Sequence, residues 1–121
     1  MQNKDKPWDI HERIYQFVID GLKLIKKVPR TPESLIIIQQ LTKSLTSMGA
    51  NDQEADGTDS AKDFVLKYSI VRKESKETNY WLRIIFDTHE DLQEEMKELR
   101  QEGKEIVKIV STIILNTKKK T

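Results

Sequence analysis

The stretch from Ser44 to Leu82 reads SLTSMGANDQEADGTDSAKDFVLKYSIVRKESKETNYWL, and its spacing decides the fold. Its second half opens a series of positions separated alternately by four and three residues: Phe64, Tyr68, Val71, Ser75, Thr78, Leu82 and Ile85. A seven-residue repeat of this kind is typical of a helix that packs along its whole length against other helices. The first half continues an earlier apolar series through Met48 and ends near Gly57. We therefore predict two long helices joined by a short turn, over about 32–56 and 59–87.

Helical spacing also extends outward on both sides of this stretch. Before it, the recurring apolar residues Ile14, Phe17, Val18, Leu22, Ile25 and Val28 predict a helix over about 8–28. After it, Leu92, Met96, Leu99, Gly103, Ile106, Val110 and Ile113 predict a helix over about 89–117. Pro29 and Pro32 stop the first helix and force a short connection. Short connections make neighbouring helices antiparallel, so we predict an all-α, up-down-up-down four-helix bundle that forms a single domain over 1–121.

Composition supports this class of fold and excludes several functions. The 121 residues include only 4 Gly and 3 Pro, and 34% of them are charged. Because there is no Cys, the chain has no disulfide and no thiolate nucleophile or ligand. The apolar runs are too short to span a bilayer, and the N-terminal residues contain no apolar core of a signal peptide. We therefore expect a cytoplasmic protein with no membrane partner.

Individual residues of the deciding stretch also match a known family. The matching residues, in order, are Ser47, Gly49, Ala50, Asn51, Glu54, Ala55, Asp63, Phe64, Lys67, Ile70, Lys73, Glu74, Glu77, Thr78, Tyr80, Trp81 and Leu82. At this spacing they resemble the bacterial four-helix-bundle family also called 23S rRNA-intervening-sequence proteins. The resemblance implies short bundles that assemble as ring pentamers. A related branch, the accessory variability determinant proteins of diversity-generating retroelements, is basic and associates with RNA and a reverse transcriptase, whereas this chain has a net charge of only +1.

Apolar residues outside the inner stripes indicate self-association. They are Ile10, Tyr15, Ile19 and Leu24 in the first predicted helix, Leu35, Ile36 and Ile37 in the second, and Val107, Ile109, Ile114 and Leu115 in the fourth. Some of them fill the edges of a wide core face. Several on one helix favour a second buried face, which in a small bundle is a subunit interface. Together with the resemblance, they predict a homo-oligomer, most readily a pentamer.

A polar seam accompanies the apolar stripes of the second and third predicted helices: Asn51, Glu54, Lys67, Glu74 and Glu77. Charges beside a core are costly unless they are paired, so we predict a hydrogen-bonded network between the second and third predicted helices, through which Glu74 is paired with Lys67. Two nearby carboxylates also allow a catalytic or metal-binding interpretation. The ferritin-like metal sites require a Glu-x-x-His motif, which is absent, and His11 and His89 fall at predicted helix ends. We therefore predict no catalytic residue, no metal and no cofactor.

Basic residues concentrate at the end of the first predicted helix, at Lys23, Lys26, Lys27 and Arg30, and Lys118–Lys120 close the chain. Cations at the C-terminus of a helix complement its dipole, which is one explanation for the first group. Contacts with a nucleic acid are the alternative. Taken with the resemblance, these patterns predict a non-enzymatic oligomeric binding or scaffold protein whose partner is RNA or an RNA-protein complex. A protein-protein interaction module with no nucleic-acid role is the alternative.

Overall fold

A computed structural model describes residues 10–120, and helices account for nearly all of them. The elements are α1 (Ile10–Ile25), α2 (Pro32–Ala55), α3 (Ala61–Thr88), the short 3-10 helix η1 (Glu90–Leu92) and α4 (Gln93–Lys119). Residues 10–120 contain no strand. None of these helices is both long and apolar enough to cross a membrane.

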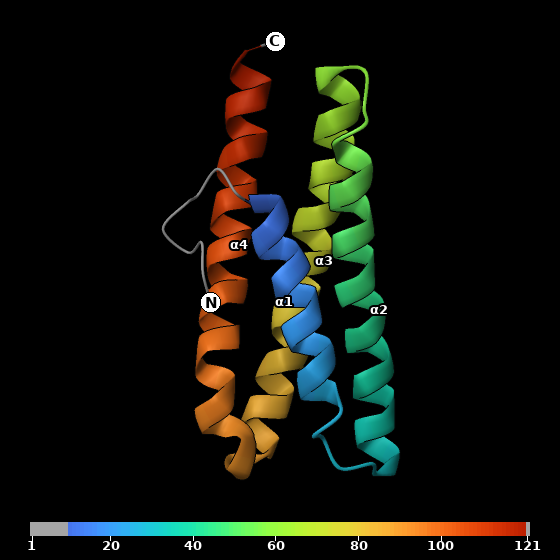
Figure 1. Cartoon of the computed structure of the whole chain (residues 1–121), viewed down its shortest axis with the longest axis vertical. Helices are drawn as coiled ribbons and strands as arrows, with labels where there is room; N and C mark the ends of the chain where they lie inside the picture. The colour runs from blue at the N-terminus through green and yellow to red at the C-terminus, as the bar shows by residue number, and fades with distance from the viewer. Residues whose placement is uncertain (1–9, 121) are drawn as a thin grey trace.

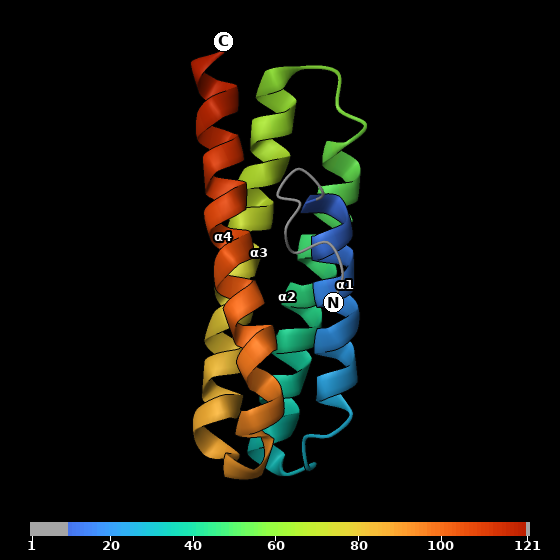
Figure 2. The same ribbon diagram turned by 60° about the vertical axis from the view of Figure 1, so that its left-hand side comes forward.

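The four α-helices form one antiparallel bundle (Figure 1). Consecutive helices pack against each other, α4 also packs against α1, and α1 and α3 lie on a diagonal. Figure 2 shows α3 and α4 side by side along their length. This is the all-α, four-helix architecture that the spacing predicts.

Local sequence signals account for two of the helix starts. Thr31 caps α2: its hydroxyl accepts the amide hydrogen of Ser34 at 3.1 Å, while the Thr31 amide donates to the Ser34 hydroxyl at 2.8 Å. Pro32 follows at the first helical position, where an N–H would have no intrahelical acceptor, so that its absence removes no hydrogen bond. Ser60 caps α3 by accepting from the Asp63 amide at 3.1 Å. The sequence predicts Thr31 as the first of these caps, and it allows either Asp59 or Ser60 as the second.

The ends of α1 and α3 differ from the predictions. α1 ends at Ile25 rather than Val28, because the chain tightens there into i→i+3 hydrogen bonds, including Val28 N–H to the Ile25 carbonyl at 3.2 Å. The predicted start of this helix at Trp8 lies outside the described residues. α3 extends to Thr88, one residue beyond the predicted end, and the Thr88 hydroxyl donates to the Ile84 carbonyl at 2.7 Å.

The core runs the length of the bundle between the four helices. Its fully buried large side chains are Phe17, Ile14, Leu41, Leu45, Met48, Tyr68, Val71, Leu82, Ile85, Met96, Ile106 and Val110. Burying each such apolar side chain contributes about 1.5–3 kcal/mol. With 16 residues, α1 is much shorter than α4, with 27, so the C-terminal part of α4 extends beyond the start of α1 (Figure 1).

Gly103 permits the close approach of α3 and α4. The Asn79 side-chain amide donates to the Gly103 carbonyl at 3.0 Å. A Cβ atom at position 103 would collide with Asn79 Oδ1 and would lie 3.1 Å from Cζ of Phe17. Only glycine fits this contact without displacing a neighbour.

Candidate functional site

The predicted polar seam does not form one network. Lys67 Nζ lies 2.6 Å from Glu54 Oε1, across α2 and α3. The predicted pairing of Lys67 with Glu74 is wrong, because Glu74 lies two turns along the same helix, roughly 10 Å away, whereas Glu54 is directly opposite. The Lys67 and Glu54 side chains are 37% and 57% exposed, so this ion pair adds at most about 1 kcal/mol.

The other members of the seam make local contacts. Glu77 accepts a hydrogen bond from Trp81 Nε1 at 3.2 Å, one turn along α3. Asn51 donates to the Ser47 carbonyl at 2.9 Å, one turn back along α2. Glu74 is half-buried and has no ion pair or hydrogen bond within residues 10–120.

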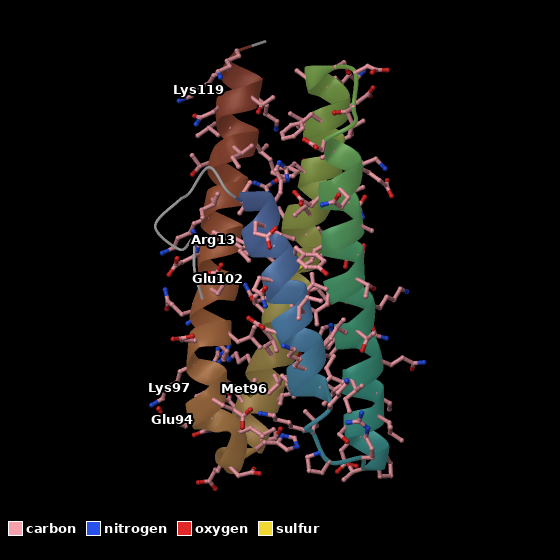
Figure 3. All side chains as sticks on the ribbon, in the orientation of Figure 1. Arg13, Glu94, Met96, Lys97, Glu102 and Lys119 are labelled. Atoms are coloured by element: carbon pink, nitrogen blue, oxygen red, sulfur yellow. The ribbon has the colours of Figure 1, made fainter. Side chains whose placement is uncertain are left out.

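A buried ion pair joins α1 to α4 instead. Arg13 holds Glu102 with two hydrogen bonds, Nε to Oε2 at 2.9 Å and Nη2 to Oε1 at 2.7 Å. Nη2 also donates to Glu105 Oε1 at 2.8 Å. The Arg13 and Glu102 side chains are 4% and 5% exposed, and both lie between the two helices in Figure 3. Hydrogen bonding to Glu102 raises the pKa of Arg13, so the guanidinium remains charged.

Sequence reasoning missed this pair, because a charged residue of an amphipathic helix is ordinarily expected on its solvent-exposed face. A weak signal was present, because Arg13 directly precedes the core residue Ile14 and Glu102 directly precedes the core position Gly103. Each therefore flanks an apolar stripe, on helices that the predicted topology makes neighbours. The complementary charges could have been matched only once the register of the two helices was known.

A second buried polar cluster joins α1, α2 and α3. Asp52 is 1% exposed, and its Oδ1 accepts the Tyr68 hydroxyl at 2.7 Å. His11 Nδ1 lies 2.8 Å from the same oxygen. Burial, and then the hydrogen bond to Asp52, raise the pKa of Tyr68, so the phenol remains neutral. The sequence signal was clear for two members, since Asp52 and Tyr68 occupy the inner stripes of adjacent helices.

These two clusters position helices. In each, the buried carboxylate is held by groups from other helices, and mutual satisfaction of that kind fixes one packing arrangement. No group of three or more His, Cys, Asp and Glu side chains within residues 10–120 could hold a metal ion.

The predicted nucleic-acid contacts lie at the end of α1, and two of the four interact within the chain. Lys27 Nζ forms an ion pair with Glu95 at 2.6 Å. Arg30 Nη1 donates to the Ile25 carbonyl at 2.8 Å and to the Val28 carbonyl at 2.6 Å. These hydrogen bonds satisfy carbonyl groups at and just after the end of α1. Lys23 and Lys26 are exposed. The second basic group, Lys118–Lys120, lies at the opposite end of the bundle, where Lys119 is labelled in Figure 3.

The surplus apolar residues divide into three groups, of which the half-buried one is Ile19, Ile37, Val107 and Ile109. Ile10, Leu24 and Ile114, predicted to lie outside the core stripes, are 2–5% exposed and belong to the core. The explanation is that α1 and α4 each contact two neighbours and therefore bury a wider face than a single stripe. The large apolar residues that remain exposed are Tyr15, Leu35, Ile36, Leu66, Ile70, Tyr80 and Leu115.

Helix α3 carries three of these exposed residues on one side. Leu66, Ile70 and Tyr80 are 58%, 37% and 57% exposed, and the half-buried Ile84 lies on the same side. Lys73 and Glu77 occupy this side between Ile70 and Tyr80. Their spacing places them away from the buried positions of the same helix. We call Leu66, Ile70, Tyr80 and Ile84 the outer α3 stripe.

A shallow groove lies between α1 and α2, with a volume of about 230 Å³. Its walls include Ile14, Tyr15 and Val18 from α1, and its α2 side is hollowed by the small residues Gly49 and Ala50. This groove is almost entirely apolar at its surface. It is therefore suited to receive an apolar side chain.

Comparison with known proteins relates this bundle to one family. The family model of the 23S rRNA-intervening sequence protein matches residues 6–112. A crystal structure of a protein of unknown function from the S23 ribosomal protein family of Bacteroides thetaiotaomicron VPI-5482 superposes with a TM-score of 0.78 at 30% identity. The alignment covers 87% of this chain and 97% of that one. Among curated proteins, none matches the sequence. The chain belongs to the 23S rRNA-intervening sequence protein family.

Proposed function

We propose that this protein is a non-enzymatic, homo-oligomeric scaffold that associates with RNA or with an RNA-protein complex. The observation that carries the proposal is the outer α3 stripe. Its members are large and apolar, and they occupy one side of a helix whose opposite side is buried in the monomer. Exposed apolar residues gathered in this way are typical of an interaction surface.

The assembly needs a second surface to receive this stripe. The apolar groove between α1 and α2 supports that role, because Gly49 and Ala50 leave room there for a side chain. Two different surfaces that meet head to tail generate a ring when the rotation closes. A ring of five is the form that the family resemblance implies, and it is the form we propose.

The assembly is tested by changing each surface separately. Ile70→Glu would place a charge on the stripe, and Ala50→Arg would block the groove. In light scattering coupled to size-exclusion chromatography, the parent should have about five times the chain mass of 14.2 kDa, and each variant should approach the chain mass itself. Both substitutions lie at the surface of the monomer, so far-ultraviolet circular dichroism should remain strongly helical.

The matched control is Leu35→Glu. Leu35 is 52% exposed, comparable to the stripe residues, but lies near the start of α2 and outside both surfaces. This variant should assemble like the parent. A monomeric parent would refute the scaffold, and an assembled Ile70→Glu variant would remove the stripe from the interface.

Two considerations support the association with RNA. The family takes its name from intervening sequences of an rRNA, and a ring would repeat each basic group around its axis, so that a nearly neutral chain presents basic rims. Binding should then be indifferent to sequence and strongly salt-dependent, because phosphate contacts release counterions. RNA retained by the purified protein at low salt, and released as the salt concentration rises, is the expected result.

A protein-protein interaction module without nucleic acid is the second candidate. The internal engagement of Lys27 and Arg30 favours it, since these residues leave fewer free cations at the end of α1. A parent that assembles but binds no RNA at low salt would support this second function.

A further inference from the structure

The charges of α4 are divided lengthwise. Three of its acidic residues face α1, where Glu102 and Glu105 bind Arg13 and Glu95 binds Lys27. The basic residues Lys97, Arg100, Lys104, Lys108 and Lys118 recur three, four or more residues apart along another side. Arg100 stacks over the Phe86 ring of α3 at 4.7 Å, which places this basic row on the α3 side of α4. The helix is therefore nearly neutral in total but basic along one edge.

A second basic row follows the facing edge of α3. Arg72, Lys76 and Arg83 share one side of the helix with Asn79, at separations of four, three and four residues. Asn79 donates to the Gly103 carbonyl of α4, so this row lies on the α4 side of α3. The acids Glu74 and Glu77 lie on another side of the helix.

The two rows meet along the contact between α3 and α4, which Figure 2 shows running the length of the bundle. We call Arg72, Lys76, Arg83, Arg100, Lys104 and Lys108 the α3–α4 basic face. Lys76, Lys104 and Lys108 are exposed, and Arg72 and Arg100 are half-buried. Within residues 10–120, none of Arg72, Lys76, Lys104 and Lys108 forms an ion pair.

Acids pair with cations at the end of this surface nearest η1. Arg83 lies 3.8 Å from Asp87, and Lys97 lies 3.0 Å from Glu94. At the other end, Lys62 and Lys118 line a groove of about 360 Å³ with Val65 and Leu66.

We propose that the α3–α4 basic face binds the phosphodiester backbone of RNA. This inference rests on the proposed association with RNA and assigns that association to a surface different from the end of α1. The α3 row from Arg72 to Arg83 and the α4 row from Lys97 to Lys108 each span 11 residues, or roughly 16 Å of helix. A linear array of cations on this scale matches a polymer that carries one charge at each nucleotide, about 3.4 Å apart along a strand.

The test compares the RNA affinity of two variants, each of which lacks four cationic side chains. The test variant carries Arg72→Gln, Lys76→Gln, Lys104→Gln and Lys108→Gln, all on the α3–α4 basic face. The matched control variant carries Lys23→Gln, Lys26→Gln, Lys27→Gln and Lys43→Gln, which change the net charge equally on other faces. Fluorescence anisotropy with a labelled single-stranded RNA of about 20 nucleotides measures affinity between about 50 and 200 mM salt.

The salt dependence gives the expected size of the effect. Each phosphate contact on a single strand contributes about 0.7 to the slope of log K against log salt, so four contacts contribute about 2.8. Over this fourfold salt range, the parent should lose about 50-fold more affinity than the test variant. The control variant should keep a slope close to that of the parent. Circular dichroism and light scattering check that all three proteins fold and assemble alike.

The outcomes separate the two proposals. If the parent binds RNA and only the control variant loses salt dependence, the α3–α4 basic face is refuted while the association with RNA stands. If the parent binds no RNA at low salt, both are refuted. Stronger binding of polyglutamate than of RNA would instead assign the face to an acidic protein partner and overturn the inference.

Discussion

The ion pair between Arg13 and Glu102 gives the sharpest test of what holds α1 in the bundle. We expect Arg13→Met to be strongly destabilising, because methionine preserves much of the apolar stem but removes both hydrogen bonds to Glu102. The Glu102 carboxylate, 5% exposed in its side chain, would then remain buried without a counter-charge.

The expected loss follows from this burial. Removing one member of a buried pair typically costs about 3–5 kcal/mol. A chain of 121 residues has a total stability of roughly 6–18 kcal/mol, so the loss is a large part of it.

Urea unfolding followed by circular dichroism measures this loss, at one protein concentration because assembly makes stability concentration-dependent. The double variant Arg13→Met with Glu102→Leu should recover most of it, since replacing both members of a buried pair with apolar residues is often neutral. Glu105, 40% exposed, can then turn to solvent. The control is Lys27→Met, which breaks a surface pair with side chains 58% and 42% exposed and should cost at most about 1 kcal/mol.

Two results would refute this reasoning. One is a loss for Arg13→Met no larger than that for Lys27→Met. The other is a double variant as unstable as the single variant. That result would show that the loss of stability comes from the packing of the arginine stem and not from the unpaired Glu102 carboxylate.

Two further substitutions test the other buried contacts in the same unfolding assay. Tyr68→Phe should cost about 1–3 kcal/mol at neutral pH, because Asp52 loses a hydrogen-bond donor. Folding raises the pKa of Tyr68, so the stability contributed by its hydroxyl is present below about pH 10 and is lost as the pH rises further. The difference in unfolding free energy between the parent and Tyr68→Phe should therefore narrow above pH 10. A difference that stays constant would contradict this. Gly103→Ala should cost about 1–3 kcal/mol despite the better helix propensity of alanine, because its Cβ displaces Asn79. The control Gly57→Ala, whose Cβ would meet only the Glu54 carbonyl oxygen at 3.8 Å, should change stability by less than about 0.5 kcal/mol.

Much of the fold could be predicted because its signals are local. The alternation of four and three residues in α3 identifies the buried side of a helix without reference to any other helix. Thr31 and Ser60 mark helix starts through hydrogen bonds to residues three positions away. The failures at Ile25 and Thr88 concern helix ends, where tight turns compete with regular helix over one or two residues.

The candidate sites and surfaces could not be predicted in the same way, because they depend on how the helices are positioned relative to one another. The pairing of Lys67 with Glu54 instead of Glu74 follows from which turn of α2 lies opposite α3. The basic edge of α4 was hidden by its near-neutral composition, because counting charges does not separate the two sides of a helix. A projection of α4 would have separated its acids from its bases, but only the contact of Arg100 with Phe86 identifies the helix that the bases face.

By itself, then, the sequence determined four amphipathic helices, their order and their antiparallel connections, because periodicity, caps and proline positions act through neighbours in the chain. Only the tertiary structure decided the register between helices. Register selects Glu102 as the partner of Arg13 and brings His11 and Tyr68 to Asp52. It also aligns the basic rows of α3 and α4. Such contacts join residues far apart in sequence, and their energies depend on a burial and distance that no single helix possesses.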